Sequence, residues 1–257
     1  MDLSIVIVSW NVKELLNKCL TTISKNSAGL SWEIVLVDNA SSDGTVETVR
    51  QKFPEVKLIA NKQNLGFAKA NNLALKEAQG EFILLLNPDT EVLSGSLEKC
   101  LAIIKDNPRI GILGCQLLNS DKSVQPSVRR FPRLWPILLL FLKLPKFFSF
   151  KSVNRYLAKD FDYQKEQTVD QVMGAFMLLP KRVIGEIGPL DERFFIWFEE
   201  VDFCRRARQK GYQVFYTPQA QIIHHGGQSF SQQGVINKQW QFFKSAWLYF
   251  KKYGFKN

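Results

Sequence analysis

The sequence lacks the short motifs that identify several common protein classes. Its four cysteines, Cys19, Cys100, Cys115 and Cys204, form no C-x-x-C pair, which argues against a zinc ribbon or a thioredoxin-like site. Isolated thiols are typical of a reducing compartment. Neither G-x-G-x-x-G nor G-x-x-x-x-G-K-[ST] occurs, which argues against a dinucleotide fold and a P-loop. Any nucleotide must therefore be held in another way.

Long apolar runs are also missing. The longest candidate, residues 134–142, has nine uncharged residues before Lys143, whereas a membrane-spanning helix needs roughly 20. Residues 1–9 have no basic region ahead of a strand-length apolar run, so we expect no signal peptide. Together with the isolated thiols, these absences predict a cytoplasmic protein.

The positive charge is unevenly distributed. The chain has 257 residues, of which 46% are hydrophobic and 34 are basic against 24 acidic, giving a net charge of +10. This apolar content is enough for a folded core. Residues 129–165 carry +7 and residues 238–257 carry +5, while the rest is close to neutral. The excess charge therefore belongs to two short segments.

Both basic segments are rich in apolar and aromatic side chains, a mixture that suits an anionic membrane surface. For residues 129–165 the alternative is a core helix with a solvated basic rim. In the C-terminal segment, one helical face carries Ile236, Trp240, Phe243, Trp247 and Phe250. That face is suited to core packing, to contact with a second copy in a homodimer, or to a membrane.

Apolar strands alternate with helices along the first half of the chain. We expect strands at residues 3–9, 33–37, 56–60 and 82–86, then at 110–118, 172–179 and 213–216, with a late helix at 199–210. Continuously apolar strands favour a mostly parallel sheet that helices cover on both faces. The predicted fold class is therefore α/β.

Polar residues follow three of these strands, at the sheet edge where ligands of α/β proteins bind. They are Ser9 and Asn11, then Asp38, then Asn87 and Asp89. Asp38 is placed to accept hydrogen bonds from a base or ribose, or to cap a helix or turn. Asp89 is suited to a divalent cation, which prefers oxygen ligands, or belongs to an ordinary turn.

Two later segments carry candidate catalytic groups. Glu199, Glu200 and Asp202 follow directly after a run of aromatic residues. Apolar side chains packed against a carboxylate raise its pKa toward that of a working base. Acids at a helix start also suit the helix dipole, and Asp202 has basic residues three and four positions on. The only histidines, His224 and His225, precede two glycines, and an imidazole there is a metal-ligand or proton-shuttle candidate.

Eight motifs occur in order over about 225 residues, and together they resemble glycosyltransferase family 2, the inverting transferases with the GT-A fold. The nearest branch resembles bacterial rhamnosyltransferases. The motifs are SIVIVSWN at 4–11, VDNASSDGT at 37–45, NLGFAKANN at 64–72, NPDTEV at 87–92, GAFMLL at 174–179, DERFF at 191–195, EEVD at 199–202 and HHGGQS at 224–229.

The resemblance implies roles for residues in the first half of the chain. A nucleoside-diphosphate sugar, linked to dTDP, UDP or GDP, would be bound by seven residues: Ser9, Asn11, Asp38, Asn64, Gly66, Lys69 and Asn87. Asp89 matches the last aspartate of the family's DXD motif and would hold Mg²⁺ or Mn²⁺. Asn87 replaces the first aspartate of that motif, which leaves Asp89 as the main carboxylate.

The resemblance also implies roles in the second half. His224 matches a pattern completed by Gly227 and Ser229 and would be a further metal or diphosphate ligand. Glu199 or Glu200 would be the catalytic base; we favour Glu200, which stands where the family usually has aspartate. The acceptor side would include Gly174, Ala175, Asp191, Trp197 and Asp202.

These features predict a metal-dependent inverting glycosyltransferase that acts on a saccharide or lipid-linked saccharide in cell-surface polysaccharide synthesis. Its GT-A domain would span residues 1–230, with a nucleotide-sugar half (1–118), an acceptor half (119–230) containing the basic insert at 129–165, and a helical tail (231–257). We expect the protein to lie on the cytoplasmic face of a membrane, and we expect no nucleic acid among its binding partners. The rival hypotheses are an inactive saccharide-binding protein, a nucleotidyltransferase and a basic nucleic-acid-binding protein.

Overall fold

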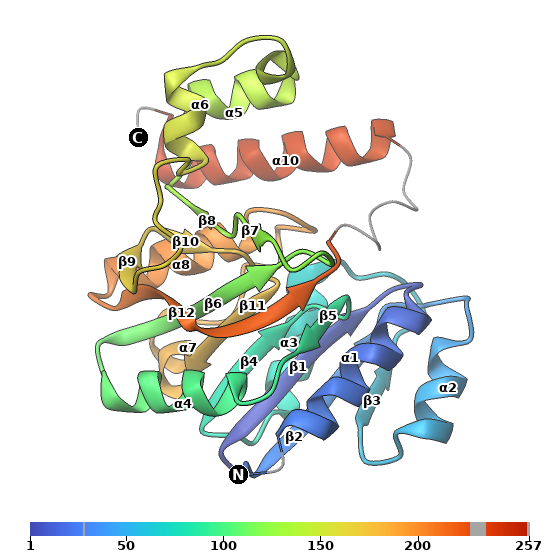
Figure 1. Ribbon diagram of the computed structural model, residues 1–257. Helices are drawn as coiled ribbons and strands as arrows, with labels where there is room; N and C mark the ends of the chain where they lie inside the picture. The colour runs from blue at the N-terminus through green and yellow to red at the C-terminus, as the bar shows by residue number, and fades with distance from the viewer. Residues whose placement is uncertain (28, 227–234, 256–257) are drawn as a thin grey trace.

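The computed structural model describes residues 1–27, 29–226 and 235–255 (Figure 1). Gly227, Ser229 and the side chain of Ile236 lie outside the described residues. The first half alternates strands and helices: β1 (Leu3–Ser9), α1 (Lys13–Asn26), β2 (Trp32–Asp38), α2 (Thr45–Lys52), β3 (Lys57–Ala60), α3 (Phe67–Glu77), β4 (Phe82–Leu86), β5 (Thr90–Val92), α4 (Ser96–Asp106) and β6 (Ile110–Leu118).

The second half has shorter elements around two long ones. In chain order they are β7 (Val124–Gln125), β8 (Val128–Arg129), α5 (Leu134–Phe141), the 3-10 helix η1 (Leu144–Lys146), α6 (Lys151–Tyr156), β9 (Gln167–Val169), β10 (Gln171–Val172), β11 (Phe176–Pro180), α7 (Lys181–Ile187), α8 (Glu199–Gln209), β12 (Gln213–His224) and α10 (Val235–Tyr253).

One large sheet organises the molecule, with strand order β3-β2-β1-β4-β11-β6-β12-β5. The four strands from β3 to β4 are parallel, and β6 is parallel to β12. The strand β11 is antiparallel to both of its neighbours, β4 and β6, and so joins the two parallel groups. Parallel strands end at the same edge, so the polar residues that follow β1, β2 and β4 lie along one rim.

Helices cover both faces of the sheet, which explains why its central strands β4, β11 and β6 are buried along their whole length. Successive side chains of β1 point to opposite faces. Leu3, Ile5 and Ile7 belong to the core cluster that includes α1 and α4, whereas Val6 packs with Ala70 and other residues of α3. All four of these β1 side chains are fully buried. The α/β fold with a mostly parallel sheet predicted from the sequence is confirmed.

A helical layer formed by α5, η1, α6 and α10 stands apart from the sheet and carries part of each basic segment (Figure 1). The helix α10 packs through Ala246, Tyr249 and Phe250 against Ile137 of α5 and against Phe198. Other aromatic side chains of α5 and α10 remain exposed, including Trp135 (69%) and Trp240 (54%). Among the described residues, no helix combines the length and apolar character that crossing a membrane requires.

Two expected strands differ from the structure in a way that matters for the site. Residues 172–179 form two strands, β10 and β11, with a break at Met173, Gly174 and Ala175. The expected strand at residues 213–216 instead extends to His224, with a register shift between Thr217 and Gln221 around Pro218. The break places Met173, Gly174 and Ala175 in the cavity lining described below. The extension of β12 carries His224 to the turn that contains Asp89.

Candidate active site

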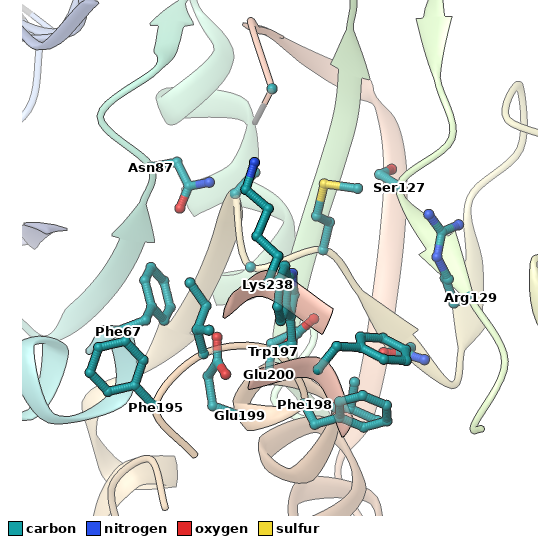
Figure 2. Close-up of a pocket in the computed structure, with 18 of the residues that line it drawn as sticks. Phe67, Asn87, Ser127, Arg129, Phe195, Trp197, Phe198, Glu199, Glu200 and Lys238 are labelled. Atoms are coloured by element: carbon teal, nitrogen blue, oxygen red, sulfur yellow. The ribbon is translucent and has the colours of Figure 1, made fainter. Parts of the chain in front are cut away.

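A cavity of about 810 Å³ lies at the rim where β1, β2 and β4 end. Figure 2 shows Asn87 and Phe67 on one side of it, Ser127 and Arg129 on the other, and Glu199 and Glu200 between them. The cavity is bordered by three groups of residues. The asparagine wall comprises Asn39, Asn64, Asn87, Asp89 and His224; the acid pair is Glu199 and Glu200; the basic wall comprises Arg129, Leu140, Phe141, Lys143 and Tyr156.

The asparagine wall is held by hydrogen bonds between loops. The Asn39 side chain accepts from Asn61 Nδ2 and donates to Gly66 O, which ties the end of β2 to the start of α3. Gly66 has φ +81°, and a Cβ there would lie 2.5 Å from Phe195 O. Only glycine permits this backbone and this close approach without strain. The asparagine wall therefore depends on a contact between the two halves of the chain.

Asp89 and His224 form the polar centre of the asparagine wall. His224 Nε2 lies 3.4 Å from Asp89 Oδ1, and both side chains are buried. The pairing of β12 with β5 places His224 opposite Thr90, and the His225 backbone N–H donates to Asp89 O. Two segments that are 135 residues apart in sequence are thus fixed beside each other.

The hydrogen bonds of Gln125 assign the tautomer of His224. The Gln125 side-chain amide N–H groups donate to Asn119 Oδ1 and to His224 O, which leaves Gln125 Oε1 facing His224 Nδ1 at 2.7 Å. An oxygen there requires Nδ1 to carry the proton. In the neutral ring, the lone pair of Nε2 then faces the Asp89 carboxylate.

This arrangement fits a divalent cation. A ring nitrogen and a carboxylate oxygen lie close together in a buried place. Mg²⁺ and Mn²⁺ prefer oxygen ligands such as Asp89, and imidazole is a common ligand of transition-metal cations. No group of three or more His, Cys, Asp or Glu side chains with metal-site geometry occurs among the described residues. The protein would thus supply two ligands, and a bound diphosphate would have to supply others.

The acid pair begins helix α8. Trp197 and Phe198, which precede it, both have positive φ values, +64° and +70°. Such values are uncommon for bulky residues, and strained backbone is often found at functional sites. One oxygen of each carboxylate, Glu199 Oε2 and Glu200 Oε2, is buried without a hydrogen-bond partner within the described part of the chain. An unpartnered buried carboxylate is costly, which points to a role in binding or chemistry.

The surroundings of the acid pair raise both of its pKa values. Burial is the main cause at Glu199, and the negative charge of Glu200 adds to it. Burial also raises the pKa of Glu200, although backbone hydrogen bonds and the positive charge of Arg129 oppose the increase. A carboxylate with a raised pKa is a stronger base at neutral pH than an ordinary glutamate.

Two predicted acceptor-side acids lie outside the cavity lining and instead hold α10. Asp202 accepts from Arg206 Nε at 2.8 Å, from Tyr253 Oη at 2.7 Å and pairs with Lys252 Nζ at 2.6 Å. Asp191 pairs with Arg193 and Lys252, which lower its pKa. Since α10 itself lines the cavity through Lys238, Gln239 and Phe242, these acids act on the cavity only by positioning that helix.

The structure brings most of the other predicted residues together. The cavity is lined by Asn64, Gly66, Asn87, Asp89, Gly174, Ala175, Trp197, Glu199, Glu200 and His224. Besides Asp191 and Asp202, four predicted residues do not line it. Lys69 is exposed on α3, and Asn11 bonds to the backbone of Ser42. Ser9 and Asp38 are buried behind the rim, where Ser9 Oγ and Asp38 Oδ1 have no partner among the described residues.

Several residues that line the cavity were not predicted from the sequence as site residues: Gln125, Ser127, Arg129, Lys143, Tyr156 and Lys238. Most lie in or beside the segment in which prolines and basic residues obscure any periodicity. The uneven positive charge was the available signal, but it did not indicate which cations face inward. Arg129 enters the cavity because β8 pairs with β10, beside the break that leads to Gly174.

Residues 4–179 match the family model of glycosyl transferase family 2. The chain is 28% identical to N-acetylglucosaminyl-diphospho-decaprenol L-rhamnosyltransferase of Mycobacterium tuberculosis, over 88% of this chain and 77% of the relative. It is 24% identical to rhamnosyltransferase WbbL of Escherichia coli, over 86% of this chain and 82% of the relative. These similarities span nearly the whole length of the chain.

Solved structures share the fold. GalNAc-T7 with UDP, GalNAc and Mn²⁺ superposes with a TM-score of 0.65 at 18% identity, covering 87% of this chain and 43% of that one. The mannosyltransferase PcManGT of Pyrobaculum calidifontis, with GDP-Man and Mn²⁺, gives a TM-score of 0.62 at 17% identity, covering 96% and 69%. The chain spans less than half of the GalNAc-T7 structure, so the likeness there is to one domain.

Proposed function

The chain belongs to glycosyl transferase family 2, and from that premise we propose that it transfers a hexose, rhamnose being our first choice, from a nucleoside diphosphate to a lipid-linked saccharide with inversion. The observation that carries this proposal is one cavity in which a buried acid pair faces the Asp89–His224 pair. The mycobacterial relative is named as an L-rhamnosyltransferase that acts on N-acetylglucosaminyl-diphospho-decaprenol, a lipid-linked saccharide.

The asparagine wall is suited to the sugar donor. Its amide groups offer both donors and acceptors of hydrogen bonds for the hydroxyls of a sugar or ribose. Asp38, with one free oxygen just behind this wall, and Ser9 are proposed to contact the nucleoside. Lys238 enters from α10 and extends toward Asn87 in Figure 2, where an ammonium group suits the departing diphosphate.

Asp89 and His224 would hold Mn²⁺ or Mg²⁺, which supplies positive charge that stabilises the leaving nucleoside diphosphate. The protein's own part in this step is to orient the ligands. Gln125 fixes the His224 ring by its hydrogen bond to Nδ1, as partners of metal-bound histidines commonly do. The ring then presents its unprotonated nitrogen to the same space as the Asp89 carboxylate.

Glu200 is proposed as the base that removes the proton from the attacking acceptor hydroxyl. It is half-buried, and its Oε2 is buried without a partner among the described residues. Gly174 lies beside it: a Cβ at Gly174 would lie 3.6 Å from Glu200 Cβ. Glu199, whose pKa is raised by burial and by the charge of Glu200, is proposed to stay protonated beside it. A single displacement needs one such base, and the displacement inverts the configuration of the anomeric carbon.

The proposal includes a peripheral position on the cytoplasmic leaflet. The exposed aromatic side chains Trp135, Phe147, Phe148, Trp240, Phe243 and Trp247 lie on α5, α10 and the segment after η1. Phe141 of α5 and Phe243 of α10 are in contact, with ring centroids 5.7 Å apart, so the two helices form a continuous face. Lysines beside exposed aromatics favour anionic lipid. Equal binding to phosphatidylglycerol and phosphatidylcholine vesicles would refute this position.

A thermal-shift screen of dTDP-, UDP- and GDP-sugars, each with Mn²⁺ or with EDTA, tests the function. A ligand at 100 times its Kd stabilises the folded state by about 2.7 kcal/mol. One sugar donor should raise the Tm with Mn²⁺ but not with EDTA, and Asp89→Asn should abolish that rise. Asp121→Asn, an exposed aspartate outside the cavity lining, is the matched control. A rise that persists in Asp89→Asn would overturn the metal assignment, and no sugar transfer from any donor would overturn the function.

A further inference from the structure

The basic wall contains two cationic side chains that form no ion pair or hydrogen bond within the described part of the chain. Arg129 and Lys143 both line the cavity, and neither side chain makes a hydrogen bond or ion pair with any described residue. Neighbouring cations are different: Arg130 pairs with Asp160, and Arg208 pairs with Asp170. Lys143 is exposed and Arg129 is half-buried, so both cations are accessible to an anion that enters the cavity.

Arg129 shares its space with the catalytic acids. Its positive charge acts on both Glu200 and Tyr156, and Tyr156 also lines the cavity. An acceptor whose hydroxyl meets Glu200 would therefore place its next substituent near the guanidinium. Guanidinium groups bind phosphate in a bidentate manner that fixes its orientation.

The basic wall also leads to the exposed apolar face. Lys143 follows α5 with a left-handed backbone, φ +56°, and stands between Leu142 and η1. Leu142 is 54% exposed, and Phe147, just beyond η1, is 77% exposed. A molecule that runs from Glu200 past Arg129 and Lys143 would meet polar, then cationic, then apolar surface. That sequence of surfaces matches a sugar, a phosphate group and a lipid chain.

We propose that Arg129 and Lys143 form a second anion subsite, which binds the diphosphate that links the acceptor sugar to its lipid. This inference rests on the proposed function and deepens it, because it assigns the acceptor's phosphate to residues of this chain. The diphosphate of the sugar donor is held elsewhere, by Asp89, His224 and the metal. The cavity thus has two anion subsites, of which only one requires a metal.

Binding of geranyl diphosphate in EDTA tests the subsite directly, because removal of the metal disables the Asp89–His224 site. Titration calorimetry should show binding to the wild type and a loss of about tenfold or more in Arg129→Gln and in Lys143→Gln. Arg130→Gln and Lys146→Gln, cations of the same segment outside the cavity lining, should bind as the wild type does. Unchanged affinity in both cavity variants, or binding that requires Mn²⁺, would overturn the proposal.

A second arm separates the acceptor's diphosphate from a membrane headgroup. Dihexanoyl phosphatidylglycerol offers a single phosphodiester on short chains. We expect it to bind at least about tenfold more weakly than geranyl diphosphate, since it carries fewer charged oxygens for a bidentate guanidinium. Equal affinity would assign the subsite to a lipid headgroup and overturn the proposal as stated.

Kinetics separate this inference from the proposed function. With a prenyl-diphosphate saccharide as acceptor, Arg129→Gln should raise KM about tenfold, whereas the KM for the same saccharide on a neutral octyl group should stay unchanged. Equal increases for both acceptors would indicate a structural role and contradict the subsite. If no donor supports any transfer but metal-free binding still depends on Arg129, the function fails while the anion subsite stands.

Discussion

The first turn of α8 carries two acids that lack a partner for one oxygen and a third acid whose oxygens are all satisfied. Glu199 and Glu200 face the cavity, and each has an oxygen without a partner in the described parts of the chain. Asp202, two residues later, is also buried, but Arg206, Lys252 and Tyr253 satisfy its oxygens. The sequence shows all three acids within four positions, so composition and spacing do not distinguish them.

The difference lies in what the rest of the fold brings to each side of the helix. On the cavity side, Gly174, the break before β11 and the rings of Trp197 and Phe198 offer no cation. Arg129 acts on Glu200 through its charge, with no ion pair or hydrogen bond between them in the described part of the chain. On the other side, the C-terminal end of α10 delivers Lys252 and Tyr253, which contact the Asp202 carboxylate directly. Partnered acids hold structure together, whereas unpartnered acids are kept at a cost that function explains.

The largest expected effect is on catalysis at Glu200. Glu200→Gln keeps the size of the side chain but removes the base, so the transfer rate should fall by about 10²- to 10⁴-fold. Binding of the sugar donor, measured by thermal shift, should remain. Glu186→Gln is the matched control, because that glutamate bonds to Tyr212 outside the cavity lining. A near-normal rate in Glu200→Gln would contradict a functional role for the acids that lack partners.

The next effect is on stability at Asp202. Asp202→Asn leaves Arg206 and Lys252 without their buried anion, so we expect a loss of about 3 kcal/mol in the free energy of unfolding, measured by urea titration. Asp160→Asn removes an exposed ion pair with Arg130 and should change stability by less than about 1 kcal/mol. Similar small changes in the two variants would show that Asp202 does not anchor α10.

The smallest effect separates the two members of the acid pair. Glu199 has the more strongly raised pKa, so its carboxyl is still protonated when Glu200 ionises. Glu199→Gln should therefore leave the transfer rate and the acid limb of its pH profile close to those of the wild type. Retained activity with an unshifted limb supports Glu200 as the base. A rate loss as large as that of Glu200→Gln would assign the base role to Glu199 instead.

Glu199→Gln should also stabilise the protein at neutral pH. Burial raises the pKa of this carboxyl in the folded state, so stability falls as pH rises from the unfolded pKa through the folded one. Removing the ionisable group should therefore add about 1 kcal/mol at pH 7 and little at pH 4. Thermal unfolding at both pH values measures this, and destabilisation at pH 7 would contradict the account.

Local sequence was sufficient for the asparagine side of the cavity. Each strand there is apolar, ends in a polar residue and runs parallel to its neighbour, so Asn87 and Asp89 could be placed at the rim from strand order alone. Gly66 was likewise indicated by its motif. The acid pair could be recognised as a candidate because apolar residues precede it directly.

Long-range pairing decides the remainder of the site. Asp202 differs from Glu200 only because α10 returns to α8 some 50 residues later in the chain. Arg129 reaches the cavity because β8 pairs with β10, and both strands are two residues long, too short for any periodicity. The same limit applies to His224, whose tautomer depends on Gln125, 99 residues away.

The central claim is a single displacement in which a buried glutamate activates the acceptor and no enzyme nucleophile takes part. The anomeric configuration of the transferred sugar, read by NMR from a product made with an anomerically pure sugar donor, tests it most directly. The account predicts that the product has the opposite configuration to the donor. A product that retains the donor configuration would contradict it.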